Sequence, residues 1–188
     1  MTASTASQVD VPLDAAAHRS NRNYPRSTNI RRVVWACVAP LFRFTPRLCY
    51  AWRNGLLRLF GAKIGRGVRI YPSVKVTFPW NLEVGDFATI GRDVELYCLG
   101  KVVIGKGSLV SQRVHVCAGT HDYTQPNLPL LTPPIRIGQG VWCCADAFLG
   151  PGITVGDGAI VGARAVVVRS VDANVIVGGN PARAIGHR

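Results

Sequence analysis

The chain has 188 residues, 48% of them hydrophobic, and its 22 Lys and Arg outnumber 10 Asp and Glu for a formal net charge of +12. This length and apolar content fit one domain with appendages. Six cysteines form no Cys-x-x-Cys pair, so the composition speaks against both a disulfide framework and a zinc site.

Residues 1–30 are polar, rich in Ser, Thr, Asn and Arg, and we expect them to form a disordered basic tail. They contain no apolar core of a signal peptide, so we expect a cytoplasmic protein. Residues 1–63 carry ten Lys and Arg against Asp10 and Asp14. This excess predicts contact with an anionic partner such as a membrane surface, an acidic polymer or a phosphorylated ligand. A solvated basic tail explains it equally well.

Residues 31–62 predict a helical segment. The apolar run 33–42 is shorter than the roughly twenty residues of a spanning helix. Residues 47–60 predict an amphipathic helix, with Leu48, Trp52, Leu56 and Leu59 or Phe60 on its apolar face. Two interpretations stay open. The segment caps the end of the domain that follows, or it rests on the anionic inner face of a membrane as a peripheral contact.

Residues 63–188 contain a repeat with a period of six, which fits neither a helix nor an alternating strand. Fifteen anchor positions are aliphatic except for one cysteine: Ile64, Ile70, Val76, Val84, Ile90, Leu96, Ile104, Val110, Val116, Ile137, Cys143, Leu149, Val155, Val161 and Val167. Small or apolar residues recur four positions after each anchor. The pattern predicts an all-β fold, a left-handed parallel β-helix of about five coils.

Each hexapeptide would form one side of a triangular coil, with its anchor pointing inward. Glycine often follows the anchor directly, and we expect it there for its backbone freedom. A β-sandwich or a buried parallel sheet would not keep fifteen anchors in phase.

One insertion and one tail interrupt this regularity. The stretch 122–136 contains four prolines and cannot join a strand ladder, so it predicts an external loop. Residues 174–188 predict a terminal strand, a tight turn and a short C-terminal cap.

Among the four histidines, His121 is the candidate catalytic residue. It stands where the third coil breaks into the loop, between Gly119-Thr120 and Asp122. A histidine there is reachable from solvent and held by rigid backbone on one side, as a general base requires. His115 lies inside the coil, and we expect no role for His18 or His187. Asp122 either orients the imidazole or caps the loop.

At these residues the chain resembles the hexapeptide-repeat acetyltransferases, left-handed β-helix enzymes. Four stretches are similar to the colanic acid biosynthesis branch, whose members are assigned to sugar O-acetylation in exopolysaccharide assembly: Gly61-Ala62-Lys63-Ile64-Gly65, Pro79-Trp80-Asn81-Leu82, Gly119-Thr120-His121-Asp122-Tyr123 and Gly179-Asn180-Pro181-Ala182-Arg183. The resemblance covers about residues 31–188.

The resemblance implies an acetyl-CoA-dependent O-acetyltransferase that acts on a sugar or glycan hydroxyl in exopolysaccharide or other surface-glycan biosynthesis. It implies sites between the subunits of a homotrimer, direct transfer with His121 as general base, and no metal. By match, the coenzyme would contact Trp142, Ala145, Ala163, Val168, Arg169 and Arg183. The family's usual Thr-Lys pair is Val168-Arg169 here, which keeps the charge and loses the hydroxyl.

Two other functions remain in view. The chain could be a non-catalytic β-helix scaffold that binds acidic polysaccharide. A metal-dependent hydratase needs three histidine ligands in one patch, and only His115 and His121 are available. We expect no nucleic-acid partner, and the acceptor sugar cannot be read from one sequence.

Overall fold

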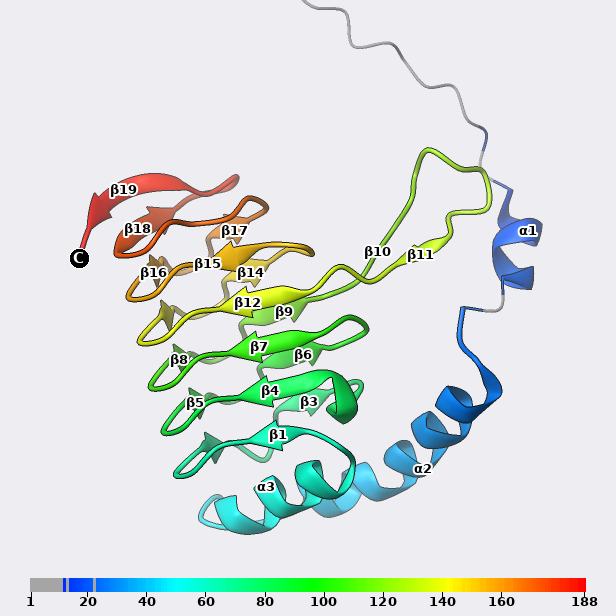
Figure 1. Cartoon of the computed structure of the whole chain (residues 1–188), viewed down its shortest axis with the longest axis horizontal. Helices are drawn as coiled ribbons and strands as arrows, with labels where there is room; N and C mark the ends of the chain where they lie inside the picture. The colour runs from blue at the N-terminus through cyan, green and yellow to red at the C-terminus, as the bar shows by residue number, and fades with distance from the viewer. Residues whose placement is uncertain (1–11, 13, 22) are drawn as a thin grey trace, which may run out of the picture.

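The computed structural model describes residues 12, 14–21 and 23–188, and its main body is a parallel β-helix with three sheets (Figure 1). The first sheet stacks β1 (Lys63–Ile64), β4 (Leu82–Val84), β7 (Val102–Ile104), β12 (Ile135–Ile137) and β15 (Thr154–Val155). The second stacks β2 (Arg69–Ile70), β5 (Thr89–Ile90), β8 (Leu109–Val110), β13 (Trp142–Cys143), β16 (Ile160–Val161), β18 (Val175–Gly178) and β19 (Arg183–His187). The third stacks β3 (Lys75–Val76), β6 (Glu95–Tyr97), β9 (His115–Cys117), β14 (Phe148–Leu149) and β17 (Val166–Val167).

Each complete coil gives one strand to each sheet, so the predicted left-handed β-helix is confirmed. Five coils are complete. A partial sixth follows, in which Val171 bridges to Val155 and β18 pairs with β16. The final strand β19 folds back antiparallel on β18, which ends the second sheet with a hairpin.

The repeat places its anchors as predicted. All fifteen are buried, with at most 8% of their surface exposed. Since no coil can bury this apolar face alone, stacking of the coils creates the core. Burial raises the pKa of the one anchor cysteine, Cys143, to about 12, which keeps it an apolar thiol.

Glycine was expected after the anchor for its backbone freedom, but the structure gives a different reason for it. At Gly105 a Cβ would lie 2.3 Å from the carbonyl oxygen of Gly138 in the next coil, so close backbone approach excludes a side chain. The left-handed backbone angles fall instead three residues after an anchor, as at Gly107 with φ of 65°.

Three helices precede the stack: α1 (Ala15–Ser20), α2 (Arg26–Arg43) and α3 (Tyr50–Leu59). The tail expected over residues 1–30 lies partly outside the described residues. In the described part, α1 is helical and α2 begins at Arg26 instead of near residue 31, and α2 continues through Pro40. Among the described helices, none combines the length and apolar character needed to cross a bilayer.

Helices α2 and α3 close the end of the stack formed by coil one (Figure 1). Each sheet ends there in a strand whose carbonyl groups have no further strand to pair with. Arg58 donates to the Ile64 oxygen of β1 at 2.8 and 3.0 Å. Arg53 donates to the Ile70 oxygen of β2, and Trp35 donates to the Val76 oxygen of β3, both at 2.8 Å.

This contact corrects the apolar face expected for α3. Arg53 is fully buried, whereas Leu48 is 83% and Leu59 80% exposed. The carbonyl groups at the end of coil one need hydrogen-bond donors, and this need decides which face of α3 is buried. An arginine supplies several donors there, whereas a leucine supplies none. Asn54 is buried for the same reason and donates to the Val68 oxygen at 2.8 Å.

The proline-rich insertion leaves the stack as a hairpin, with β10 (Thr120–His121) antiparallel to β11 (Leu130–Leu131). It ends earlier than expected, because Ile135 and Arg136 already belong to β12. A single 3₁₀ turn, η1 (Pro79–Asn81), marks the corresponding corner between coils one and two.

Candidate active site

His121 ends β10 at the corner between the third and first sheets, where the hairpin leaves the stack. Its side chain is exposed, and its Nδ1 lies 2.7 Å from the carbonyl oxygen of Leu128. A carbonyl oxygen only accepts hydrogen bonds, so this partner assigns the proton to Nδ1 and leaves the Nε2 lone pair free. That is the tautomer in which Nε2 can accept a proton from a substrate.

The backbone of the hairpin fixes the orienting carbonyl. Leu128 has a φ of 46°, a left-handed conformation that is unfavourable for a bulky side chain. The Leu128 amide donates to Gln125, and the Asp122 amide donates to Pro129 at 3.0 Å. A costly conformation maintained by such bonds at the residue that orients His121 is typical of functional sites.

Both carboxylate oxygens of Asp122 accept hydrogen bonds within the loop, and none of these bonds comes from the His121 ring. Oδ1 accepts from the hydroxyl of Thr124 at 2.6 Å and from its amide at 3.0 Å, and Oδ2 accepts from Gln125. These bonds, led by the Thr124 hydroxyl, lower the pKa of Asp122. Of the two roles expected for this residue, the geometry favours capping the loop.

His115 lies on the outer face of the third sheet. It is half-buried, and its ring meets Phe148 edge-on with 5.3 Å between centroids. Its Nε2 is buried and has no hydrogen-bond partner among the described residues. The aromatic packing fits the expectation that His115 belongs to the coil.

A third histidine, His18, was not expected near the site. Helix α1 lies against the hairpin, where His18 Nδ1 is 3.1 Å and Asn21 Nδ2 is 2.8 Å from the carbonyl oxygen of Asn127. The His18 ring meets His121 edge-on, with 5.3 Å between centroids. No local signal in the sequence predicts this contact, because it joins segments more than one hundred residues apart.

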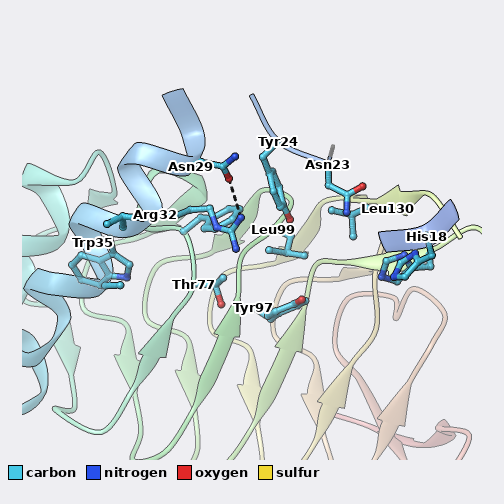
Figure 2. Close-up of a pocket in the computed structure, with 14 residues that line it drawn as sticks. His18, Asn23, Tyr24, Asn29, Arg32, Trp35, Thr77, Tyr97, Leu99 and Leu130 are labelled. Atoms are coloured by element: carbon cyan, nitrogen blue, oxygen red, sulfur yellow. Dashed lines mark hydrogen bonds between the residues drawn. The ribbon is translucent and has the colours of Figure 1, made fainter. Parts of the chain in front are cut away.

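A cavity of about 840 Å³ opens beside His121, between the N-terminal segment and the corner of coils one to three. Figure 2 shows the side chains around it, with Tyr24 and Arg32 on one side and Thr77 and Tyr97 on the other. Its volume lies within the range of small-molecule sites, and its lining joins aromatic rings with a few polar groups.

The residues matched to coenzyme binding lie at two separate corners. Val168 and Arg169 follow β17 at the corner that also carries His121, two coils further along. Arg183 begins β19, and all three line one hollow of about 200 Å³. The structure therefore brings the two arginines together, at a distance from the cavity beside His121.

The remaining three matched residues belong to another corner. Ala145 and Ala163 occupy the same turn between the second and third sheets, one coil apart, and the Arg164 amide donates to the Ala145 oxygen at 2.9 Å. Trp142 is an outward residue of β13, 44% exposed, and its Nε1 donates to Ser111 at 3.0 Å. Within one chain the third sheet separates this corner from Arg169, whereas Arg183 pairs with Gly178 at the end of β18 in the second sheet.

Metal chemistry was not expected, and over the described ranges no three His, Cys, Asp or Glu side chains are grouped to hold an ion. No protein-family model matches this sequence. Individual proteins do match it, both in sequence and in structure.

The chain is 49% identical over 154 residues to the Escherichia coli K12 protein named "Putative colanic acid biosynthesis acetyltransferase WcaF", which covers 82% of this chain and 85% of that protein. Among solved structures, a galactoside acetyltransferase in complex with coenzyme A is similar, with a TM-score of 0.81, 22% identity and coverage of 88% of this chain and 84% of that one. A hexapeptide-repeat-containing acetyltransferase of Vibrio cholerae, complexed with acetyl coenzyme A, matches with a TM-score of 0.80, 22% identity and coverage of 88% and 91%. At these identities the two solved structures speak for the fold alone.

Proposed function

The chain belongs to the hexapeptide-repeat acetyltransferases and is therefore an acyltransferase, and we propose that it transfers an acetyl group from acetyl-CoA to a sugar hydroxyl. The relative named for colanic acid biosynthesis supports a role in exopolysaccharide or other surface-glycan assembly. Acetyl-CoA is the donor that we propose by analogy with the two structures of the same fold, which hold coenzyme A and acetyl coenzyme A. A cytoplasmic location accords with that donor.

The observation that carries the proposal is the bond between His121 Nδ1 and the Leu128 oxygen. It leaves Nε2 free on a residue that lines the cavity, where we propose that an acceptor hydroxyl donates to it. In the proposed reaction, His121 takes the hydroxyl proton as the oxygen attacks the thioester carbonyl. The new bond joins oxygen to the acetyl carbon, the carbon–sulfur bond breaks, and the proton passes to the leaving thiolate. Asp122 contributes by shaping the loop.

The coenzyme would be bound by the residues at the two corners. Arg169 and Arg183 would bind phosphate groups, which suit guanidinium forks. Trp142, Ala145 and Ala163 would line the pantetheine, and Val168 offers only apolar contact. Since the third sheet separates Arg169 from Ala145 and Ala163 within one chain, we propose a homotrimer in which each coenzyme lies between neighbouring subunits. Light scattering that gives a fully active monomer would exclude this arrangement.

The test of the function is acetyl transfer by wild type and by His121→Ala. We expect the variant to keep coenzyme A binding and to lose about 10²–10⁴-fold in kcat, the usual contribution of a positioned general base. His115→Ala is the matched control and should lose much less, because His115 packs against Phe148 on the sheet. The assignment fails if His115→Ala is the inactive variant. A chain that binds acidic polysaccharide but no coenzyme A would be a scaffold.

We also propose that the turn between α2 and α3 touches an anionic membrane surface. Phe44 is 87% exposed there beside exposed Leu48, and Trp52 Nε1 donates to the Leu41 oxygen at 3.0 Å. Residues 15–82 contain thirteen Lys and Arg and no Asp or Glu. An apolar patch in a basic surface suits anionic lipid headgroups.

Co-sedimentation tests this contact. Wild type should bind vesicles of phosphatidylglycerol and phosphatidylcholine, leave them at high salt, and ignore phosphatidylcholine alone. Phe44→Ser should weaken the binding at unchanged thermal stability. Equal binding by wild type and Phe44→Ser would exclude this turn as the contact.

A further inference from the structure

The cavity beside His121 is elongated and chemically different at its two ends. His18 lies toward one end, against His121, and Arg32 and Asn29 lie toward the other, with Trp35 beyond them (Figure 2). Tyr24 and Tyr97 stand between them. Aromatic rings along a cavity suit the apolar face of a sugar ring. The opposite end offers cationic and amide donors.

A second hollow of about 520 Å³ adjoins this end. Asn23, Tyr24, Asn29 and Arg32 line both hollows, and the second also includes Arg26. A ligand whose sugar ring lies beside His121 can therefore extend past Arg32 toward Arg26. All side chains that line the second hollow come from the N-terminal segment, residues 21–32.

The charge at this end is uncompensated. Arg32 donates to the Asn29 oxygen at 3.1 Å and stacks on Tyr24 with 4.8 Å to the ring centroid. No Asp or Glu lines either hollow, and neither Arg26 nor Arg32 forms an ion pair with any described residue. Guanidinium groups pair well with carboxylate and phosphate oxygens.

Tyr24 adds a donor to the same place. Burial, and then the neighbouring Tyr97, raise the pKa of Tyr24, so its hydroxyl keeps its proton. Arg32, Tyr24 and Asn29 thus present guanidinium, hydroxyl and amide hydrogens together, an arrangement that suits an anion.

We propose that the acceptor is an anionic saccharide, whose carboxylate or phosphate is bound by Arg32 while its hydroxyl lies beside His121. This inference rests on the proposed sugar O-acetylation and adds the charge class of the acceptor. A uronic acid and a sugar phosphate present the same chemistry to Arg32, and the experiment separates them.

The experiment measures binding of three sugars with one ring type: glucose, glucuronate and glucose 1-phosphate, by calorimetry in the presence of coenzyme A. At least one charged sugar should bind about tenfold or more tightly than glucose, since a hydrogen bond to a charged group strengthens binding by about that factor. The sugar that gains identifies the anion as carboxylate or phosphate. Equal binding of all three, or binding of none, overturns the proposal.

The matched pair of variants is Arg32→Gln and Arg31→Gln. Arg31 is the next residue of α2 and also stacks on an aromatic ring, 4.2 Å from the centroid of Trp80, but it does not line the cavity. Arg32→Gln should remove the advantage of the charged sugar and leave glucose binding unchanged. Arg31→Gln should leave both within about twofold. An equal loss in the two variants would mean a general effect of surface charge, against the proposal.

Two further readouts keep the outcomes separate. Thermal unfolding checks that Arg32→Gln keeps its fold, and if it does not, the wild-type comparison of the three sugars still decides. A chain that binds the charged sugar but no coenzyme A would refute acetyl transfer and leave the anion site standing. A chain that acetylates neutral sugars as readily as charged ones would confirm acetyl transfer and refute the anion site.

Discussion

The anchors of the β-helical stack are apolar, whereas the N-terminal helices bury polar side chains as well as apolar ones. In the stack, the anchor positions are aliphatic apart from Cys143, and the backbone of each coil forms hydrogen bonds with the next coil. In α3 the buried side chains include Arg53 and Asn54, while Leu59 and, in the turn before α3, Leu48 face solvent. The difference follows from position, because coil one has a neighbour on one side only and its outer carbonyl groups need donors.

This contrast predicts that the stack is sensitive to lost apolar volume. Leu96 is a fully buried anchor on β6, an interior strand of the third sheet. Leu96→Ala should lower the free energy of unfolding by about 2–5 kcal/mol, since it removes buried methyl groups and leaves a cavity. Denaturation by guanidinium chloride measures the change.

The control for Leu96 is a leucine outside the stack. Leu131, in the hairpin, is 45% exposed, so Leu131→Ala should change the free energy of unfolding by about 0.5 kcal/mol or less. Equal losses in the two variants would mean that the stack does not depend on its anchors.

The helical cap should instead be sensitive to lost hydrogen bonds. Arg53 donates to the oxygens of Ile70, Thr45, Pro46 and Arg47 at 2.5–2.8 Å. Arg53→Ala should destabilise the protein by about 1–3 kcal/mol, because it leaves buried carbonyl groups without a donor. Thermal unfolding of the variant beside wild type measures this.

Leu48→Ala is the contrasting change, since helical spacing places Leu48 on the buried face and the structure places it in solvent. We expect it to be nearly neutral, within about 0.5 kcal/mol. A large loss of unfolding free energy in Leu48→Ala, together with no loss in Arg53→Ala, would mean that the apolar face predicted from helical spacing packs on the stack after all.

The two regions also differ in how far the sequence predicts them. The repeat requires an apolar side chain at each of fifteen anchor positions, so the pattern remains recognisable despite a single exception such as Cys143. The break at His121 is visible against that regularity, which is why the candidate base could be named. The apolar spacing in α3 occurs only once in the chain, so no repetition supports it. The carbonyl groups that decide which face of α3 is buried lie in coil one, which the local sequence of the helix does not reveal.

The cavity beside His121 illustrates the same limit. Its wall depends on the Asp14 amide, which donates to the Pro126 oxygen at 2.9 Å, and on His18 against His121. Contacts between an N-terminal segment and a distant loop produce no periodic pattern in the sequence of either segment, so the sequence does not predict them. The two groups of coenzyme residues were named by resemblance, and spacing alone would not have selected them.

The smallest expected effect is the change in unfolding free energy at low pH, which should differ between the β-helical stack and the helical cap. Glu83 in the first sheet accepts from Lys63 at 2.8 Å and from Lys101 at 3.0 Å, and these bonds, led by Lys63, lower the pKa of Glu83. A carboxyl whose pKa is lower in the folded than in the unfolded chain stabilises the fold above its unfolded pKa. That contribution is lost as the pH falls through the folded pKa.

Glu83→Gln should therefore flatten part of the decline in unfolding free energy below about pH 5, by no more than about 1 kcal/mol because the pair is largely exposed. Arg53→Ala should instead lower stability by a similar amount at every pH between about 5 and 3, since no Asp or Glu occurs between residues 15 and 82. Urea denaturation across this range, in wild type and both variants, makes the comparison. A Glu83→Gln curve parallel to wild type would show that the lysine pair adds nothing, and an Arg53→Ala loss that vanishes at low pH would mean that the cap depends on an acidic partner elsewhere in the chain.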